Sequence, residues 1–195
     1  ERKTMLDELH SLTRHVDHIK TIVAMQQSYA GVAGVVETVS LAELLDDALK
    51  LNAPSLEKYS VEVVRDYEYL PEVGIEKQKV LQILVNLVTN AKDSLAEGGG
   101  ANRRLTATIR LQKHDDGDTV LIEVGDNGVG ISPDNVTKIF SHGFTTKKHG
   151  HGFGLHSSAN AAKELGGKLT AHSEGQGHGA LFTLELPFHP VEVLV

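Results

Sequence analysis

The chain has 195 residues, of which 40% are hydrophobic and 23% charged, enough for one full domain and a small appendage. It contains no cysteine, which excludes a disulfide framework and a thiolate zinc site, and its formal net charge of -7 argues against nucleic acid as a partner. No apolar run approaches the roughly 20 residues that cross a bilayer, so this region is expected to be cytoplasmic. Attachment of the parent protein to the inner membrane by a segment outside this sequence stays open.

Residues 1–32 are predicted to form one long helix. Six apolar residues repeat along it every three or four positions, as in a heptad seam: Met5, Leu9, Leu12, Val16, Ile19 and Val23. A single helix cannot bury such a narrow seam, so we favour part of a helical bundle over a cap packed on its own domain. Residues 33–40 are expected to be a linker with a first strand near residues 35–39.

Residues 41–190 are predicted to form one domain of mixed helices and strands, followed by a tail at 191–195. Ser40 and Glu43 form a capping box for a helix that starts at Leu41. Hydrophobic periodicity predicts helices near residues 76–96 and 155–165, and strands near residues 61–67, 105–112, 119–124, 168–172 and 180–186. This mixture indicates an α+β fold, a two-layer α/β sandwich.

Two asparagines share one face of the long helix. Asn86 and Asn90 are four residues apart, and Asp93 follows about one turn later. A carboxamide oxygen suits a hard cation such as Mg²⁺, which relies on substrate phosphates for much of its binding. Taken alone, however, the pattern is better explained by buried asparagines that are hydrogen-bonded to nearby backbone.

Glycine-rich clusters follow the strands. Asp126 stands at the end of an apolar strand, where its carboxylate could accept a hydrogen bond from an exocyclic amine, or where residues 126–128 simply form a tight turn. Residues 150–154 lead into a helix whose free N–H groups could bind phosphate, or they form only a hinge. A last cluster comprises Gly175, Gly177 and Gly179. The chain lacks a P-loop, and its glycines do not fit a dinucleotide βαβ unit.

Together the clusters resemble the boxes of the histidine-kinase ATPase superfamily, which includes gyrase-type, mismatch-repair and heat-shock chaperone ATPases. Residues 86–91 resemble the N box, residues 126–131 the G1 box, residues 140–147 the F box of sensor kinases and residues 152–155 the G2 box. Residues 177–182 are similar to the glycine-rich end box. This resemblance implies a Bergerat-type ATP-binding fold, in which a mixed, mainly antiparallel sheet carries helices on one face.

The resemblance also implies ATP and Mg²⁺ as cofactors. Asn90 is expected to ligate Mg²⁺ with help from Asn86, and Asp126 to bind the adenine amino group. Residues 132–151 would form an ATP lid, in which Lys147 neutralises phosphate charge or belongs to a solvated face. Asn86, Asn90 and Lys147 are then the catalytic residues, and the nucleotide contacts are Asn86, Asn90, Asp93, Asp126, Gly128, Gly130, Ile131, Phe140, Phe144, Thr145, Gly150, Gly152, Phe153, Gly154, Leu155 and Thr183.

By the same resemblance, the protein is a protein-histidine kinase of a two-component system. It would transfer the γ-phosphate of ATP to a histidine for relay to an aspartate of a response regulator. Its expected partners are ATP or ADP, its own phosphoacceptor helix, a response regulator, and a second copy joined through the bundle. His10, His15 and His18 lack the following Glu or Asp that accompanies the family's acceptor. The acceptor is therefore expected on a helix upstream of this sequence.

Three alternatives remain. The superfamily's ATP hydrolases carry a glutamate where this chain has Asn86, and an amide cannot act as a general base. A serine kinase of the anti-sigma-factor type needs no helical bundle, and a degenerate scaffold module would not keep every box. The four histidines of the lid region are expected to be polar lid residues rather than zinc ligands: His142, His149, His151 and His156.

Overall fold

The computed structural model describes residues 34–191 except 99, 116 and 148–151. The expected bundle helix, its three histidines, Gly150 and most of the tail therefore lie outside the described residues. The described elements, in chain order, are β1 (Glu37–Val39), α2 (Leu41–Lys58), β2 (Glu62–Tyr67), β3 (Val73–Ile75), α3 (Lys77–Gly98), β4 (Arg104–Gln112), β5 (Thr119–Asp126), α4 (Pro133–Val136), α5 (Gly154–Glu164), β6 (Lys168–His172) and β7 (Ala180–Pro187).

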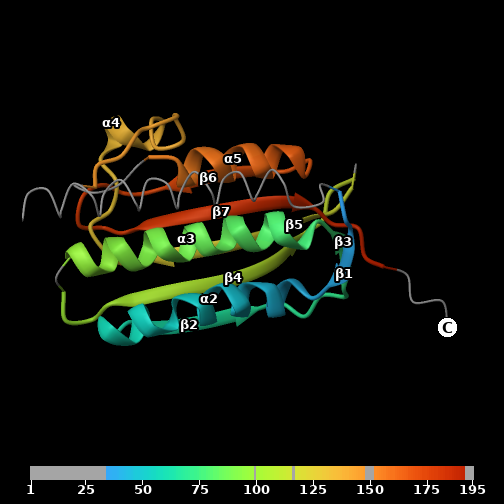
Figure 1. The fold of residues 1–195 in the computed structure, drawn as a ribbon, viewed down its shortest axis with the longest axis horizontal. Coiled ribbons are helices and arrows are strands. Elements are labelled where there is room, and N and C mark those ends of the chain that lie inside the picture. The colour runs from blue at the N-terminus through green and yellow to red at the C-terminus, as the bar shows by residue number, and fades with distance from the viewer. Residues whose placement is uncertain (1–33, 99, 116, 148–151, 192–195) are drawn as a thin grey trace, which may run out of the picture. The chain divides into compact units, whose positions relative to one another are not determined.

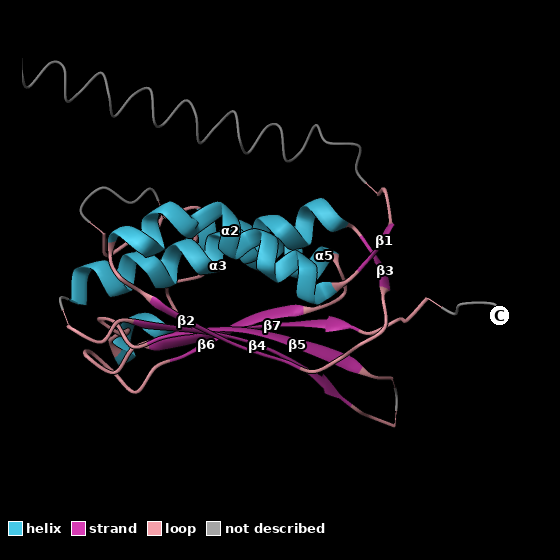
Figure 2. Ribbon diagram, turned by 90° about the horizontal axis from the view of Figure 1, so that it is seen from below, coloured by secondary structure: helices cyan, strands magenta, loops and turns pink. Residues whose placement is uncertain are grey.

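The main sheet has five strands in the order β2-β4-β5-β7-β6. All neighbouring strands are antiparallel except β2 and β4, which are parallel. Helices α2, α3 and α5 cover one face of this sheet, with α3 in the middle, and the other face is open (Figures 1 and 2). The two-layer α+β sandwich with a mixed, mainly antiparallel sheet is thus confirmed.

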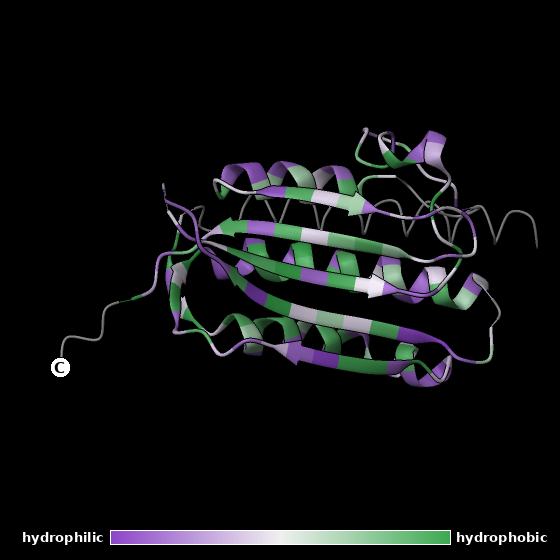
Figure 3. Cartoon of the chain, turned by 180° about the vertical axis from the view of Figure 1, so that it is seen from behind, coloured by the Kyte–Doolittle hydropathy of each residue, from purple (hydrophilic) through white to green (hydrophobic). Residues whose placement is uncertain are grey.

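The core lies between the helices and the sheet. The apolar residues that recur every three or four positions along α3 are buried, among them Val80, Ile83, Leu84, Leu87, Val88 and Ala91. Alternate residues of the strands meet them, for example Leu105, Ala107 and Ile109 of β4. The residues between them point to the open face, and Figure 3 shows hydrophilic and hydrophobic residues interspersed along the strands. The helix layer therefore fixes which side of each strand is buried.

Some features of the fold, among them the short helix α4, were not predicted. The short strand β3 pairs antiparallel with β1 in a small separate sheet at one end of the domain, and its three residues show no readable alternation (Figure 2). Helix α3 also continues through Gly98, two residues beyond the predicted end near residue 96. A Cβ atom at Gly98 would lie 3.3 Å from the Gly128 backbone, so this glycine permits close packing of the helix end.

Among the described helices, none combines the length and the apolar character that a membrane crossing requires.

Candidate functional site

Asp126 ends strand β5 with its carboxylate held by two donors. Oδ1 accepts hydrogen bonds from the Ser94 hydroxyl at 2.7 Å and from the Gly128 backbone N–H at 2.8 Å. Burial raises the pKa of Asp126, and these two hydrogen bonds and the charge of Lys147 oppose that rise. Both described bonds involve Oδ1, so Oδ2 is the oxygen that can serve an additional donor.

The loop after Asp126 is packed between the end of α3 and the loop before β7. The Gly177 N–H donates to the Val129 carbonyl at 2.7 Å, and the Gly179 N–H donates to the Gly128 carbonyl at 3.2 Å. Gly130 has a φ of +70°, and a Cβ there would overlap the carbonyl oxygen of Gly175. The end-box glycines thus fix the position of the G1 loop.

A second contact of this loop comes from a serine. The Ile131 N–H donates to the Ser173 hydroxyl oxygen at 3.0 Å, and that hydroxyl donates to the Gly179 carbonyl at 2.6 Å. No local pattern marks Ser173 or Ser94, because each serine supports a loop that is distant in the chain. Ile131 itself packs against the core.

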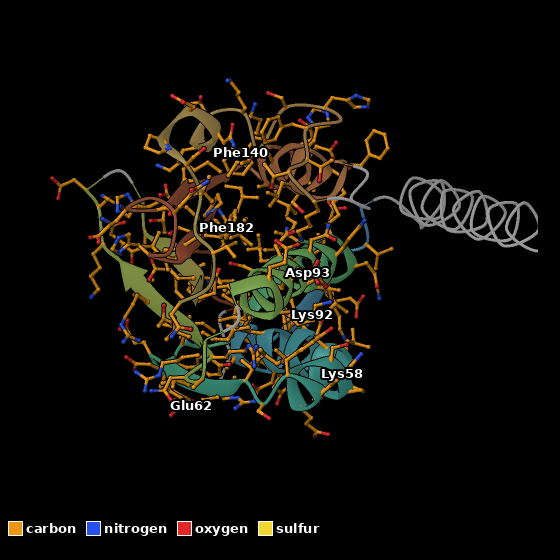
Figure 4. The ribbon with its side chains drawn as sticks, turned by 90° about the vertical axis from the view of Figure 1, so that its left-hand side faces the viewer. Lys58, Glu62, Lys92, Asp93, Phe140 and Phe182 are labelled. Atoms are coloured by element: carbon orange, nitrogen blue, oxygen red, sulfur yellow. The ribbon has the colours of Figure 1, made fainter. Side chains whose placement is uncertain are left out.

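The C-terminal part of α3 holds a cation. The Lys147 ammonium donates to Asn90 Oδ1 at 2.9 Å and to Asp93 Oδ2 at 2.8 Å, and Lys92 pairs with Asp93 Oδ1 at 2.6 Å. Burial would raise the pKa of Asp93, but its bonds to Lys147 and Lys92 hold it below the ordinary value. Figure 4 looks onto this end of α3, where Lys92 and Asp93 are labelled. Asn90 and Asp93 are therefore arranged to hold a positive charge.

Asn86 connects α3 to the beginning of α5. Its amide group donates to the Ser158 hydroxyl at 3.1 Å and to the Gly154 carbonyl at 3.4 Å. The N-cap of α5, Phe153, makes no side-chain capping bond. Gly152, with a φ of +69°, lies so close to Gly143 that a Cβ would come within 2.6 Å of the Gly143 carbonyl oxygen. The uncapped start of α5 therefore lies beside the N box and can offer N–H groups to an anion.

The lid segment is fastened to α5 by aromatic and polar contacts. His156 Nδ1 lies 3.0 Å from the Phe140 carbonyl oxygen, and the His142 ring lies 4.9 Å from the Phe153 ring. The expected nucleotide contacts Phe140, Phe144 and Leu155 are partly buried against the core, and Figure 4 marks Phe140. The exposed Thr145 accepts from the Lys147 backbone N–H at 3.1 Å. These contacts position Lys147 toward α3.

One expected contact, Thr183, lies apart from the others. Thr183 lies on the open face of the sheet, where its hydroxyl donates to Glu123 Oε1 at 3.1 Å. In β7 the residues that face the helices are Ala180, Phe182 and Leu184. Thr183 lies between Phe182 and Leu184 and therefore points to the opposite side. Thr183 is therefore turned away from the region between the helices and the lid, and Figure 4 labels its inward-facing neighbour Phe182.

The contacts described above link several of the other expected residues to α3. Helix α3 supplies a polar face, the end of β5 a partly buried carboxylate, the lid an ammonium group, and α5 an uncapped N-terminus. Such an arrangement can bind a molecule that has an amine at one end and an anionic group with a cation at the other.

Comparison with known proteins gives the family. Residues 75–190 match the family model described as histidine kinase-, DNA gyrase B- and HSP90-like ATPase. The sensor histidine kinase ZraS of Salmonella typhimurium is 31% identical over 153 residues, which cover 77% of this chain and 31% of that protein. The C4-dicarboxylate transport sensor protein DctB of Pseudomonas aeruginosa is 34% identical over 185 residues, or 93% of this chain and 29% of that protein. The chain thus spans about a third or less of the length of these relatives.

Solved structures agree with this relationship. The catalytic domain of histidine kinase ThkA is similar with a TM-score of 0.67 and 25% identity, covering 78% of this chain and 95% of that one. Full-length ShkA in complex with AMPPNP is similar with a TM-score of 0.68 and 25% identity, covering 82% of this chain and 32% of that one. The chain therefore belongs to the family of histidine kinase-, DNA gyrase B- and HSP90-like ATPases, and it carries the ATP-binding catalytic domain of sensor histidine kinases.

Proposed function

We propose that this domain binds ATP together with Mg²⁺ and transfers the γ-phosphate to a histidine outside the described residues. In that transfer the bond between the γ-phosphorus and its bridging oxygen breaks, ADP leaves, and a phosphorus–nitrogen bond forms. The observation that carries the proposal is the ammonium of Lys147 held by Asn90 and Asp93, on the same helix whose Asn86 contacts the uncapped start of α5. Charge stabilisation and positioning are what phosphoryl transfer requires from a protein.

The residues present fit a magnesium ion. The Lys147 ammonium stands in for a cation at Asn90 Oδ1 and Asp93 Oδ2, and oxygen atoms of this kind are the ligands that Mg²⁺ prefers. Asn90 and Asp93 would hold the ion, which would neutralise charge on the phosphates. With the ion at these two residues, the Lys147 ammonium would be available to the phosphate oxygens.

The two ends of the nucleotide would be bound by different groups. Asp126 Oδ2 would accept from the adenine amino group, with Gly128 and Gly130 shaping the wall beside the base. The N–H groups at the start of α5, from Gly154 and Leu155, would bind phosphate oxygens. ShkA, a solved relative, is described in complex with the ATP analogue AMPPNP, which supports ATP as the ligand.

Phosphoryl transfer is favoured over ATP hydrolysis by the position of Asn86. Its amide nitrogen donates to Ser158 and Gly154, so this side chain braces the start of α5. An amide has no useful basicity and cannot activate a water molecule. Asn86 would therefore support the phosphate-binding helix, and an external histidine would serve as the nucleophile.

The remaining functions follow from the relatives and belong to the whole protein. ZraS is named as a sensor histidine kinase and DctB as a sensor protein of C4-dicarboxylate transport. By analogy, the parent of this chain would phosphorylate its own acceptor helix within a dimer and pass the phosphate to a response regulator. By the same analogy with sensor kinases, the parent protein would be attached to the inner membrane.

The test is the Asn90→Ala variant in the full-length kinase. We expect it to lose Mg²⁺-dependent transfer from γ-labelled ATP to histidine while its circular dichroism spectrum stays unchanged. Glu97→Ala, an exposed position near the end of α3, is the matched control and should transfer normally. Normal transfer by the Asn90→Ala variant would remove this residue from the cation site.

A further inference from the structure

Ser94 stands at a junction between α3, Asp126 and the G1 loop. Its hydroxyl donates to Asp126 Oδ1 at 2.7 Å and accepts from the Val129 N–H at 3.1 Å, and its own carbonyl accepts from the same N–H at 3.4 Å. Among the described residues, Ser94 is the side chain that is hydrogen-bonded both to the Asp126 carboxylate and to the loop that follows it. The hydroxyl of Ser94 therefore couples the position of Asp126 to the position of the loop.

This junction requires a residue without a side chain at position 128. A Cβ at Gly128 would lie 2.5 Å from the carbonyl carbon and oxygen of Ser94, closer than such atoms approach. Because Gly128 is buried and has no side chain, the loop can approach α3 closely enough for its N–H to reach Asp126. Ser94 and Gly128 together use Oδ1 of Asp126 and leave Oδ2 as the free acceptor.

We propose that Ser94 is a specificity-determining positioning residue, which orients the Asp126 carboxylate so that Oδ2 selects a 6-amino purine over a 6-oxo purine. This inference rests on the proposed function, in which Asp126 faces the adenine base. An ionised carboxylate can only accept hydrogen bonds, so it matches the amine of adenine and repels the carbonyl oxygen of hypoxanthine or guanine. The discrimination holds only while Asp126 is both ionised and correctly turned.

Ser94 serves both conditions. Donation from its hydroxyl favours the charged form of Asp126, against the effect of burial, and it stops the carboxylate from rotating. The other charged group that acts on Asp126 from the lid is Lys147. On the side of the open sheet face, a cavity of about 330 Å³ next to Asp126 is lined by four more charged or titratable groups: Arg104, His172, Glu174 and His178. These groups are the same in wild type and variant, so a difference between the two reports on Ser94.

The experiment compares Mg²⁺-ADP and Mg²⁺-IDP binding by calorimetry on the whole chain. IDP differs from ADP at the base by a 6-carbonyl group in place of the 6-amino group. We expect Ser94→Ala to weaken ADP about 3- to 10-fold, the value of one hydrogen bond, and to leave IDP unchanged or tighter. The preference for ADP, measured as the ratio of the two affinities, should therefore fall. As the pH is lowered, the variant should lose ADP binding at a higher pH than the wild type, because Asp126 is protonated earlier.

Two further variants separate positioning from folding. Ser94→Thr keeps the hydroxyl and should restore the ratio, whereas Ser55→Ala makes the same change at a partly buried position of α2 and should alter nothing. Equal weakening of ADP and IDP in Ser94→Ala, with an unmoved pH profile, would overturn the inference and leave Ser94 a structural residue. A wild-type chain that binds ADP and IDP equally would also overturn it. A wild-type chain that binds neither would overturn the proposed function itself.

Discussion

The contact between Lys147 and α3 allows a quantitative prediction. Lys147→Met keeps a long side chain but removes the ammonium that donates to Asn90 and Asp93. Hydrogen bonds to charged groups contribute about 1.5–3 kcal/mol, whereas exposed ion pairs contribute about 0.2–1 kcal/mol. Both side chains of the Lys147–Asp93 pair are 31% exposed, so solvent screens it considerably. We therefore expect the variant to lose about 1 kcal/mol of stability in the absence of nucleotide.

The assay is thermal unfolding of the nucleotide-free chain. A loss of this size should lower the Tm by about 2–4 °C for a domain of this length. Lys138→Met removes an exposed lysine from the same lid segment and is the matched control, with an expected Tm equal to that of the wild type. If Lys147→Met also melted at the wild-type temperature, the lysine would not contribute to holding the lid against α3, and the argument would fail.

The pH dependence gives a second check on the same variant. Lys147 and Lys92 hold the pKa of Asp93 below its ordinary value of 3.8 despite burial. A carboxyl group whose pKa falls on folding stabilises the protein above its unfolded pKa, and this contribution is lost as the pH drops through the folded pKa. The stability difference between wild type and Lys147→Met should therefore be complete at pH 7 and shrink below about pH 4. A difference that grew on acidification would contradict the assignment.

Two other substitutions test the site and its boundary. Gly128→Ala places a Cβ against Ser94, and we expect it to lower the free energy of unfolding by about 1–3 kcal/mol and to weaken ADP binding. Urea denaturation and calorimetry measure these effects, with Gly100→Ala, which has open space around its Cα, as the control; unchanged ADP affinity in Gly128→Ala would show that the loop tolerates displacement. Thr183→Val removes the hydroxyl that bonds Glu123 on the open face and should leave ADP affinity unchanged. A tenfold loss of ADP affinity in calorimetry would show that Thr183 contributes to nucleotide binding.

The architecture could be predicted from the sequence, and so could the residues that are marked by a local pattern, such as the end of a strand or a shared helical face. Asp126 stood out because it follows an apolar strand directly, and Asn86 and Asn90 because they share a helical face at a spacing of four. These are local signals, so they need no knowledge of the fold. The assignment of these residues to a nucleotide and Mg²⁺ came from the resemblance to the family. The helix and strand positions were likewise predicted from hydrophobic periodicity, which reflects the single face that each element buries.

Local patterns in the sequence do not reveal contacts between distant segments or the side to which a strand residue points. Ser94 supports Asp126 from another element, 32 positions away, so no local pattern marks it. Thr183 was assigned to the site by its nearness to the glycine-rich box, but the two-residue period of β7 turns it to the open face. The parallel pairing of β2 with β4 depends on the path of the chain through α3, which periodicity alone does not reveal.

A single uninterrupted helix connects both ends of the site, which bears on the length of ligand that the domain accepts. Asn86 braces the start of α5, and Ser94 holds the carboxylate of Asp126. Eight residues separate them in α3, which corresponds to about 12 Å along the helix axis at 1.5 Å per residue. A rigid spacer of this length cannot be shortened to suit a smaller molecule. A bare nucleoside would therefore reach only the base end, and occupation of both ends requires a ligand that carries its phosphates across that span.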